Sequence, residues 1–273
     1  MTTEIARQLI YAFSQGGRGG NPSFLIVSSG APPDWAALAP AAQQLARTLA
    51  CEVSHLHLGQ QGTQLRFYVA AGELAFCGHG ALAAAAWGLA HGQLQPGMQL
   101  HYAHGSVQIQ QDADGAPALL EQAGALHELP LCAALSAQAG AMLGWPALPE
   151  ASRLWLGGRQ RAKALILLPA PADLRALVLQ PALRDQFCLE HGVSGIYPMC
   201  FPAPGQVLAR HFPLHAHELE DMATGNIAAS VAALCGAPQV RISQGGPDCD
   251  QACLRVQTGA DGGWLVGGAC RFA

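Results

Sequence analysis

The chain has 273 residues and a mass of 28.3 kDa, which is enough for one large domain or two lobes. It is 51% hydrophobic and only 12% charged, a composition that excludes disorder and predicts a sizeable core. The net charge of -4 leaves no basic surface for nucleic acid or an anionic membrane. The longest uninterrupted apolar stretch, residues 81–87, is far below the roughly 20 residues that span a bilayer, and the N-terminus lacks a secretion signal. We therefore expect a cytoplasmic protein that binds neither nucleic acid nor membrane.

The 32 Gly and 18 Pro are spread along the whole chain, which indicates many short strands joined by turns. In chain order, strands are expected at 8–13, 23–28, 65–70, 106–111, 164–168, 195–200, 207–212, 253–257 and 263–272. Amphipathic helices are expected at 34–50, with Asp34 as the N-cap, at 136–143 and at 172–186. The last of these is expected to bury Leu174, Leu177, Val178 and Leu183 on one face. The class is α+β, with more strand than helix.

Two further helices, at 81–90 and 227–234, are apolar on every side and must therefore be surrounded by protein. The segments that introduce them, 73–86 and 220–233, align without gaps at a constant offset of 147 residues. Such a repeat predicts two pseudo-symmetric lobes, each a curved, mostly antiparallel sheet or barrel around a central Ala-rich helix. We expect a first lobe at 1–118, to which a strand at about 260–273 returns, and a second lobe at 119–259. Two unrelated Ala-rich helices are the alternative.

In each copy a glycine, Gly78 or Gly225, stands where the chain enters the buried helix. The unpaired N–H groups of a helix's first turn bind anions, and the helix dipole assists them. Two such termini facing one cleft between the lobes would bind a small carboxylate.

The residues beside these turns suit proton transfer. They are Cys77 and His79 in the first copy, and Glu220, Asp221, Thr224 and Asn226 in the second. Four of these residues have an alternative structural role. Cys77 could be a packed thiol, His79 a helix cap, and the two acids an ordinary acidic first turn.

We expect no metal, nucleotide or flavin. The nine cysteines are expected to be reduced thiols, and none forms a C-x2-C pair. The pairs His55/His57 and His215/His217 each place two rings on one strand face, but no third ligand has a definite spacing. The glycine-rich run 16–20 precedes Asn21-Pro22 and a strand, which does not fit a nucleotide loop.

Several segments together resemble the PhzF family, the phenazine-biosynthesis-type isomerases that share the diaminopimelate epimerase fold. They are Gly20-Asn21-Pro22, residues 65–68, the run Glu-Leu-Ala-Phe-Cys-Gly-His at 73–79, Arg-His-Phe-Pro at 210–213, and Glu-Asp-Met-Ala-Thr-Gly at 220–225. The resemblance implies two similar lobes, an active site between them, no cofactor, and a homodimer as the common assembly. For the founding members it implies isomerisation of a dihydro-hydroxyanthranilate by acid/base proton transfer.

By this resemblance, His79 and Asp221 match polar active-site residues, and Gly78 and Gly225 match backbone donors. Asn21, Thr224 and Asn226 are the further substrate-binding candidates, although the family more often has Ser at the place of Asn226. The family's principal acid/base is a Glu after the first helix. An ungapped alignment puts Val53 there, so either a one-residue shift lets Glu52 serve or the acid is missing.

The residues and the family resemblance together imply a cofactor-independent isomerase with Glu52, His79, Asp221 and Cys77 as candidate catalytic residues. Racemases of the same fold use two cysteines, but Thr224 stands at the second place, which excludes a symmetric two-thiol mechanism. A racemase or dehydratase of an amino or hydroxy acid that uses Cys77 with Thr224 is the alternative. A non-enzymatic protein that binds a small molecule is the second alternative.

Overall fold

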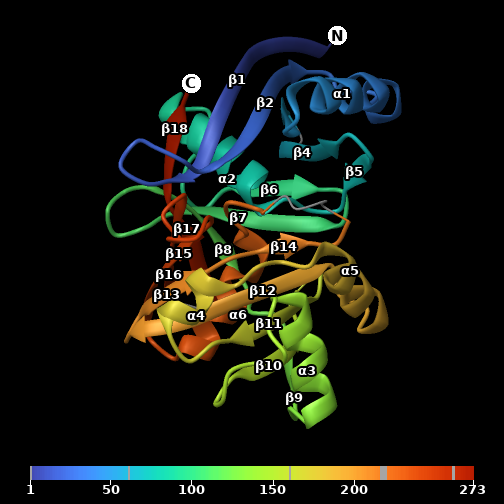
Figure 1. Ribbon diagram of the computed structural model, residues 1–273. Coiled ribbons are helices and arrows are strands. Elements are labelled where there is room, and N and C mark those ends of the chain that lie inside the picture. The colour runs from blue at the N-terminus through green and yellow to red at the C-terminus, as the bar shows by residue number, and fades with distance from the viewer. Residues whose placement is uncertain (1, 61, 160, 216–219, 260–261) are drawn as a thin grey trace. The chain divides into compact units, whose positions relative to one another are not determined.

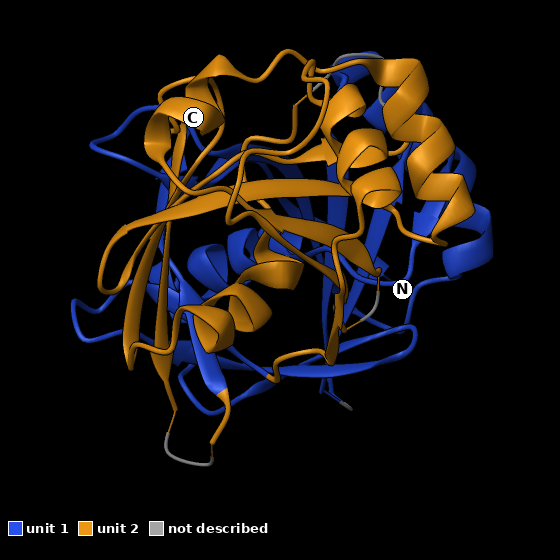
Figure 2. Cartoon of the chain, turned by 60° about the horizontal axis from the view of Figure 1, so that its bottom comes forward, with its two compact units in different colours: residues 1–121, 264–273 blue, residues 122–263 orange. Residues whose placement is uncertain are grey.

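The computed structural model describes residues 2–60, 62–159, 161–215, 220–259 and 262–273 (Figure 1). The chain divides into two compact units (Figure 2). Unit 1 comprises residues 1–121 together with 264–273, and unit 2 comprises residues 122–263. The end of the chain therefore belongs with its beginning.

Unit 1 starts with a long antiparallel hairpin of β1 (Thr2–Ser14) and β2 (Asn21–Gly30). Helix α1 (Trp35–Leu49) then leads to β3 (Glu52–Gly59), which pairs parallel to β2. Strand β4 (Gly62–Val69) runs antiparallel to β3, and the short β5 (Gly72–Leu74) follows it. The connection through α1 places the beginning of β3 beside the beginning of β2.

The rest of unit 1 wraps the sheet around helix α2 (Gly78–Ala90). Strand β6 (Gln99–Tyr102) pairs with β4, followed by β7 (Gly105–Gln111) and β8 (Pro117–Glu121). Two C-terminal strands complete the sheet, β17 (Trp264–Gly267) beside β8 and β18 (Ala269–Phe272) beside β1. Helix α2 contacts β1, β2, β3, β8 and β18, so the sheet surrounds it. The small Ala side chains of α2, almost all fully buried, allow this close enclosure.

Unit 2 begins with β9 (Leu126–Leu129) and α3 (Ala133–Met142), followed by the antiparallel pair β10 (Arg153–Gly157) and β11 (Lys163–Leu167). Helices α4 (Pro171–Ala176) and α5 (Pro181–Glu190) lead to β12 (Gly195–Ala203), parallel to β11. Next come β13 (Gln206–Ala209), β14 (Phe212–Pro213) and helix α6 (Gly225–Cys235). The unit ends with β15 (Gln239–Gln244), parallel to β13, and β16 (Ala252–Thr258).

Both units therefore repeat one order of elements. A hairpin is followed by helical structure and then by a strand that pairs in parallel with the second hairpin strand. The next strand is antiparallel to that one, and after the buried helix a last strand pairs with it in parallel. The buried helices begin at Gly78 and Gly225, which keeps the offset found in the sequence. The expected α+β class with two similar lobes around central Ala-rich helices is confirmed.

The expected helix at 34–50 is confirmed as α1, where Asp34 Oδ1 accepts a hydrogen bond of 3.1 Å from the Ala37 N–H. The helix at 136–143 corresponds to α3, and those at 81–90 and 227–234 lie within α2 and α6. Six strands in the described part of the chain were not expected: β5, β6, β8, β9, β10 and β15. No helix in the described part of the chain has the length and apolarity needed to cross a membrane.

The single helix expected at 172–186 is wrong, because the chain forms α4 and α5 with an extended segment between them. Pro181 has no N–H and disfavours helical geometry in the residue before it. The Val178 N–H donates to the Leu143 carbonyl at 2.9 Å, and the Gln180 N–H donates to the Met142 carbonyl at 2.8 Å. Of the four residues expected on the buried face, Leu174 and Leu177 are buried, whereas Val178 and Leu183 are exposed.

Candidate functional site

The first residue of β3, Glu52, is a carboxylate in the interior of unit 1, with 6% of its surface exposed. Alternate residues of a strand face opposite sides, so Glu52 shares a face with Ser54. Val53 lies on the other face, in a core cluster with Ile26 and Ala42 beneath α1. Of the two positions left open by the sequence, Glu52 is the one that lies beside the start of α2.

The Glu52 carboxylate is held by serines from two strands. Ser54 Oγ donates to Glu52 Oε1 at 2.7 Å, and the hydroxyls of Ser54 and Ser23 are 3.1 Å apart. Ser23 is opposite Glu52 in the register of β2 and β3. Burial raises the pKa of Glu52 above its ordinary value, although nearby His79 and the hydrogen-bonding side chains act in the opposite direction. A raised pKa suits a group that both accepts and returns a proton near neutrality.

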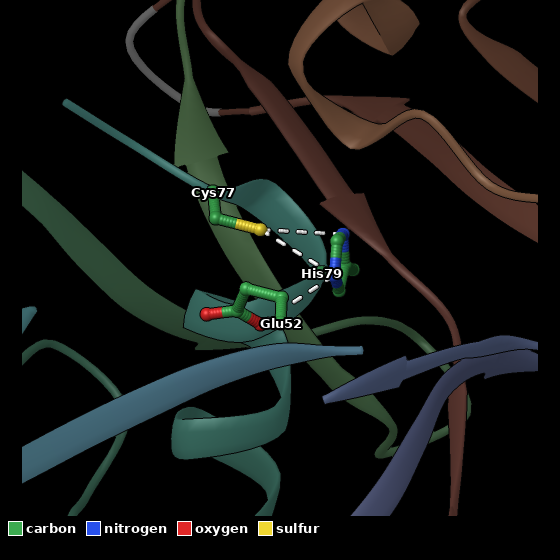
Figure 3. Close-up of side chains that lie close together, drawn as sticks. All are labelled: Glu52, Cys77 and His79. Carbon is green, nitrogen blue, oxygen red and sulfur yellow. Dashed lines mark hydrogen bonds and ion pairs between the residues drawn. The ribbon is translucent and has the colours of Figure 1, made fainter. Parts of the chain in front are cut away.

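The N-terminus of α2 brings Cys77 and His79 to this carboxylate (Figure 3). His79 Nε2 is 3.5 Å from Glu52 Oε2, and Cys77 Sγ is 3.3 Å from His79 Nδ1. Cys77 occupies the N-cap position but makes no side-chain capping bond. The three side chains form one cluster, with the unpaired N–H groups of the first helical turn beside it.

Gly80, in the first turn of α2, makes this close approach sterically feasible. A Cβ atom at this position would lie 2.8 Å from both carboxylate oxygens of Glu52 and would overlap the Ser54 hydroxyl. The site therefore requires glycine at 80.

A metal ion could also bind to this cluster of Glu52, Cys77 and His79. In the described part of the chain, it is the group of side chains with suitable ligand atoms close together. One donor atom from each residue lies within 4.8 Å of the others. Carboxylate, thiolate and imidazole are ligands that Zn²⁺ accepts. The expectation that the protein works without metal stays a prediction.

In unit 2, Asp221 lies just before α6 in a network of buried side chains. Thr224 at the N-cap position donates from its hydroxyl to Asp221 Oδ2 at 2.8 Å, and His211 Nδ1 is 3.0 Å from the same oxygen. Gln244 Nε2 donates to Thr224 Oγ1 at 2.9 Å. Burial lowers the pKa of Lys163, a nearby residue of β11, to about 8. The structure thus brings together Asp221 and Thr224, which the sequence analysis named separately as candidates.

Glu220 has a different environment from its neighbour. Arg210 Nη2 lies 2.8 Å from Glu220 Oε2, and the Gly246 N–H donates to Glu220 Oε1 at 3.0 Å. Both side chains of this ion pair are largely buried. Glu220 is therefore committed to a structural pair, which leaves Asp221 as the carboxylate candidate of unit 2.

The remaining substrate-binding candidates lie at the starts of elements. Asn21 begins β2, two residues before Ser23 and on the same strand face. Gly225 and Asn226 are the first two residues of α6, and buried Asn226 Oδ1 accepts no hydrogen bond from the described residues. Gly78 begins α2 in the same way.

The His-x-His pairs are engaged elsewhere. His55 Nε2 and His57 Nδ1 both contact Ser28 Oγ, at 2.9 and 3.1 Å. They lie on the face of β3 opposite Glu52, and His57 lines a cavity of about 410 Å³. His215 Nδ1 is 3.3 Å from Asp185 Oδ2, and His217 lies outside the described residues.

Several residues of the two clusters were not predicted. Ser54 could have been found from its spacing of two residues from Glu52, and His211 lies within the segment 210–213 that already carried the family resemblance. Ser23, Lys163 and Gln244 have no local signal, because strand pairing brings them to the clusters from distant parts of the chain.

A scan against family models and a search of curated proteins found no match. Solved structures do match over the full length. A PhzF-family phenazine biosynthesis protein from Bacillus anthracis has a TM-score of 0.79 at 15% identity, covering 100% of this chain and 97% of that one. A predicted epimerase from Pseudomonas aeruginosa has a TM-score of 0.74 at 20% identity, covering 98% and 96%. A hydroxyproline epimerase from Agrobacterium vitis, with trans-4-hydroxy-L-proline bound, has a TM-score of 0.57 at 12% identity, covering 100% and 92%. The chain therefore has the fold that these proteins share, the diaminopimelate epimerase-like fold.

Proposed function

We propose that this protein is a cofactor-independent isomerase that moves a proton on a small metabolite bearing a carboxylate. The observation that carries the proposal is the buried Glu52 carboxylate beside His79 and Cys77 at the start of α2. The fold shared with PhzF-family proteins and epimerases supports the reaction type.

In the proposed reaction, ionised Glu52 removes a proton from an acidified C–H bond of the substrate. The electron pair of that bond moves into the conjugated system of the substrate, and Glu52 becomes a neutral carboxylic acid. Glu52 then returns the proton to another carbon, which restores its charge and completes the isomerisation. Because burial raises the pKa of Glu52, the neutral acid formed in the first step is less disfavoured than it would be for an exposed carboxylate.

The substrate carboxylate is proposed to bind the N–H groups that begin the buried helices, at Gly78 in unit 1 and at Gly225 in unit 2. Asp221 is the proposed second acid/base group, and Asn21, Thr224 and Asn226 are proposed to bind substrate. The expected cleft between the lobes stays a prediction.

Hydrogen–deuterium exchange tests the proposal directly. The protein is incubated in heavy water with carboxylates that carry an acidified C–H bond, including a dihydro-hydroxyanthranilate, and exchange is followed by NMR. Glu52→Gln is expected to slow exchange by roughly 100-fold or more, a typical loss for an acid/base group. Asp221→Asn is expected to act in the same direction.

Glu128→Gln is the matched control, since Glu128 is an exposed carboxylate of unit 2 paired with Arg153. It should leave the exchange rate unchanged. If wild-type protein binds carboxylates but exchanges the hydrogen of none of them, the result favours a non-enzymatic protein that binds a small molecule.

A second candidate is a racemase, epimerase or dehydratase that uses Cys77. The short distance from Cys77 Sγ to His79 Nδ1 favours it, because an imidazole can accept the thiol proton. L-Proline and trans-4-hydroxy-L-proline should then exchange their α-hydrogen. Cys77→Ser would abolish exchange while Glu52→Gln would be nearly silent, which is the opposite of the result expected for the isomerase.

Cofactor independence belongs to the same proposal. Elemental analysis and an absorption spectrum of purified protein should show neither stoichiometric metal nor flavin. Stoichiometric zinc that Cys77→Ser removes would contradict it. The homodimer and the cytoplasmic location also stay predictions.

A further inference from the structure

The network around Asp221 in unit 2 allows each hydrogen atom to be assigned. Tyr197 Oη donates to Gln244 Oε1 at 2.8 Å, and the Thr224 N–H donates to the same oxygen at 3.3 Å. The Gln244 amide is thereby fixed, with its Nε2 group donating to the Asp221 carbonyl at 2.8 Å and to Thr224 Oγ1 at 2.9 Å.

The assignment then extends to His211. The single hydroxyl hydrogen of Thr224 is donated to Asp221 Oδ2. His211 Nδ1 is 2.9 Å from Thr224 Oγ1 and 3.0 Å from Asp221 Oδ2. Both oxygens can only accept at this contact, because the carboxylate has no hydrogen and the hydroxyl hydrogen is already used. Nδ1 must therefore carry a hydrogen.

The other ring nitrogen of His211, Nε2, is inaccessible to solvent. His211 is 4% exposed, and its Nε2 atom is buried with no hydrogen-bond partner among the described residues. A Cβ atom at Gly195 would lie 2.8 Å from Nε2, so the ring fills the space that a side chain at 195 would need. Gly195 begins β12, as Glu52 begins β3. Where unit 1 places a carboxylate at this strand start, unit 2 has glycine and the His211 ring.

Burial lowers the pKa of His211 to about 4, although Asp221 raises it. The groups that act on it are the carboxylate of Asp221 and the cations of Lys163 and Arg161, with the Tyr197 ring at 5.9 Å. The imidazole is therefore neutral at neutral pH, with its hydrogen on Nδ1.

We infer that His211 is a positioning residue that, as the neutral Nδ1–H tautomer, fixes the Asp221 carboxylate for proton transfer. The inference rests on the proposed role of Asp221 and adds a residue to it. Two neutral donors on Oδ2, from Thr224 and His211, stabilise the negative charge and fix the carboxylate plane. Because Nε2 is buried, His211 acts through Asp221 rather than on a substrate.

The tautomer is tested by NMR on the full-length protein with ¹⁵N-labelled histidine and no substrate. His211→Asn identifies the signal by its loss. We expect a protonated Nδ1 and a bare Nε2 from pH 8 down to pH 5.5. An Nε2–H tautomer, or protonation near the ordinary histidine value, would overturn the inference. Since no substrate is present, this result is independent of whether the proposed function holds.

The positioning role is tested by two variants in the exchange assay. The Asn side chain keeps an N–H donor near the position of Nδ1, so His211→Asn is expected to retain the exchange rate within about threefold. His211→Leu keeps the bulk but not the donor and is expected to lose roughly 10- to 100-fold. Equal losses in both variants would overturn the role. If the wild-type protein exchanges none of the carboxylates but shows the expected tautomer, the proposed function is refuted while the hydrogen assignment stands.

Discussion

At the scale of single residues, Gly80 is the position where the addition of one methyl group should most disturb the Glu52 cluster. A helix normally gains about 1 kcal/mol when Gly is replaced by Ala. Here the added Cβ would lie 2.8 Å from both oxygens of the Glu52 carboxylate. The carboxylate would have to move away from His79, and its place in the cluster would be lost.

We expect Gly80→Ala to lower the exchange rate at least tenfold and the free energy of unfolding by about 1–3 kcal/mol, measured by chemical denaturation. Gly88→Ala in the same helix is the matched control. Its added Cβ would meet the Leu94 side chain, so it should destabilise the protein without slowing exchange. Equal loss of exchange in both variants would show that helix packing, and not the Glu52 contact, is responsible.

The sequence could not decide between Glu52 and Val53, and the reason is physical. A shift of one residue along a strand moves a side chain to the opposite face. Both faces of β3 are buried, so no polar pattern marks which face is which. The pairing with β2 fixes the register by placing Ser23 opposite Glu52, and the contact of Glu52 with His79 identifies the face that lies beside α2.

At the scale of elements, the two apolar helices depend on small side chains. Ala84 of α2 is fully buried, and the surrounding sheet leaves no space for a larger residue. We expect Ala84→Leu to lower the free energy of unfolding by about 1–3 kcal/mol, measured by chemical denaturation. Ala37→Leu is the control, because Ala37 lies on the exposed side of α1 and should tolerate the change within about 0.5 kcal/mol.

Elements with a local signal were predicted correctly. The Asp34 cap and the Ala-rich runs mark α1, α2 and α6 without reference to distant residues. The break between α4 and α5 was not predicted although Pro181 marks it, because the helical spacing of apolar residues continues on both sides of the proline. Strands β6, β9 and β10 are short and defined by their partners, which local sequence does not identify.

At the scale of the whole molecule, the units repeat an order of elements but not the chemistry of their polar clusters. Unit 1 combines Glu52 with His79 and Cys77, whereas unit 2 combines Asp221 with His211 and Thr224. The gapless alignment of 73–86 with 220–233 was enough to predict the repeat. The alignment could not predict the role of His211, because His211 lies outside the aligned segment 220–233. Non-equivalent groups suit a directional isomerisation better than a symmetric racemisation.

Each unit also buries a neutral histidine, and together these should make the protein sensitive to acid. The pKa of His55 in unit 1 and of His211 in unit 2 is lowered to about 4, in both cases chiefly by burial. An unfolded histidine titrates near 6.5. Between these values the unfolded chain binds protons that the folded chain does not, so stability is fully present above about pH 6.5 and falls as the pH drops toward 4. The groups that act on them are His57, Glu4 and Arg7 for His55, and Asp221, Lys163 and Arg161 for His211.

We expect the free energy of unfolding to fall between pH 6.5 and 4 by on the order of 3 kcal/mol for each of the two histidines, at about 1.4 kcal/mol per pH unit. Chemical denaturation at a series of pH values measures this slope. His211→Asn removes one titrating group but keeps the donor to Asp221, so it should make the slope shallower. His104→Asn should not, because His104 is exposed. A slope that is the same in all three proteins would mean that carboxylates, and not the buried imidazoles, govern acid unfolding.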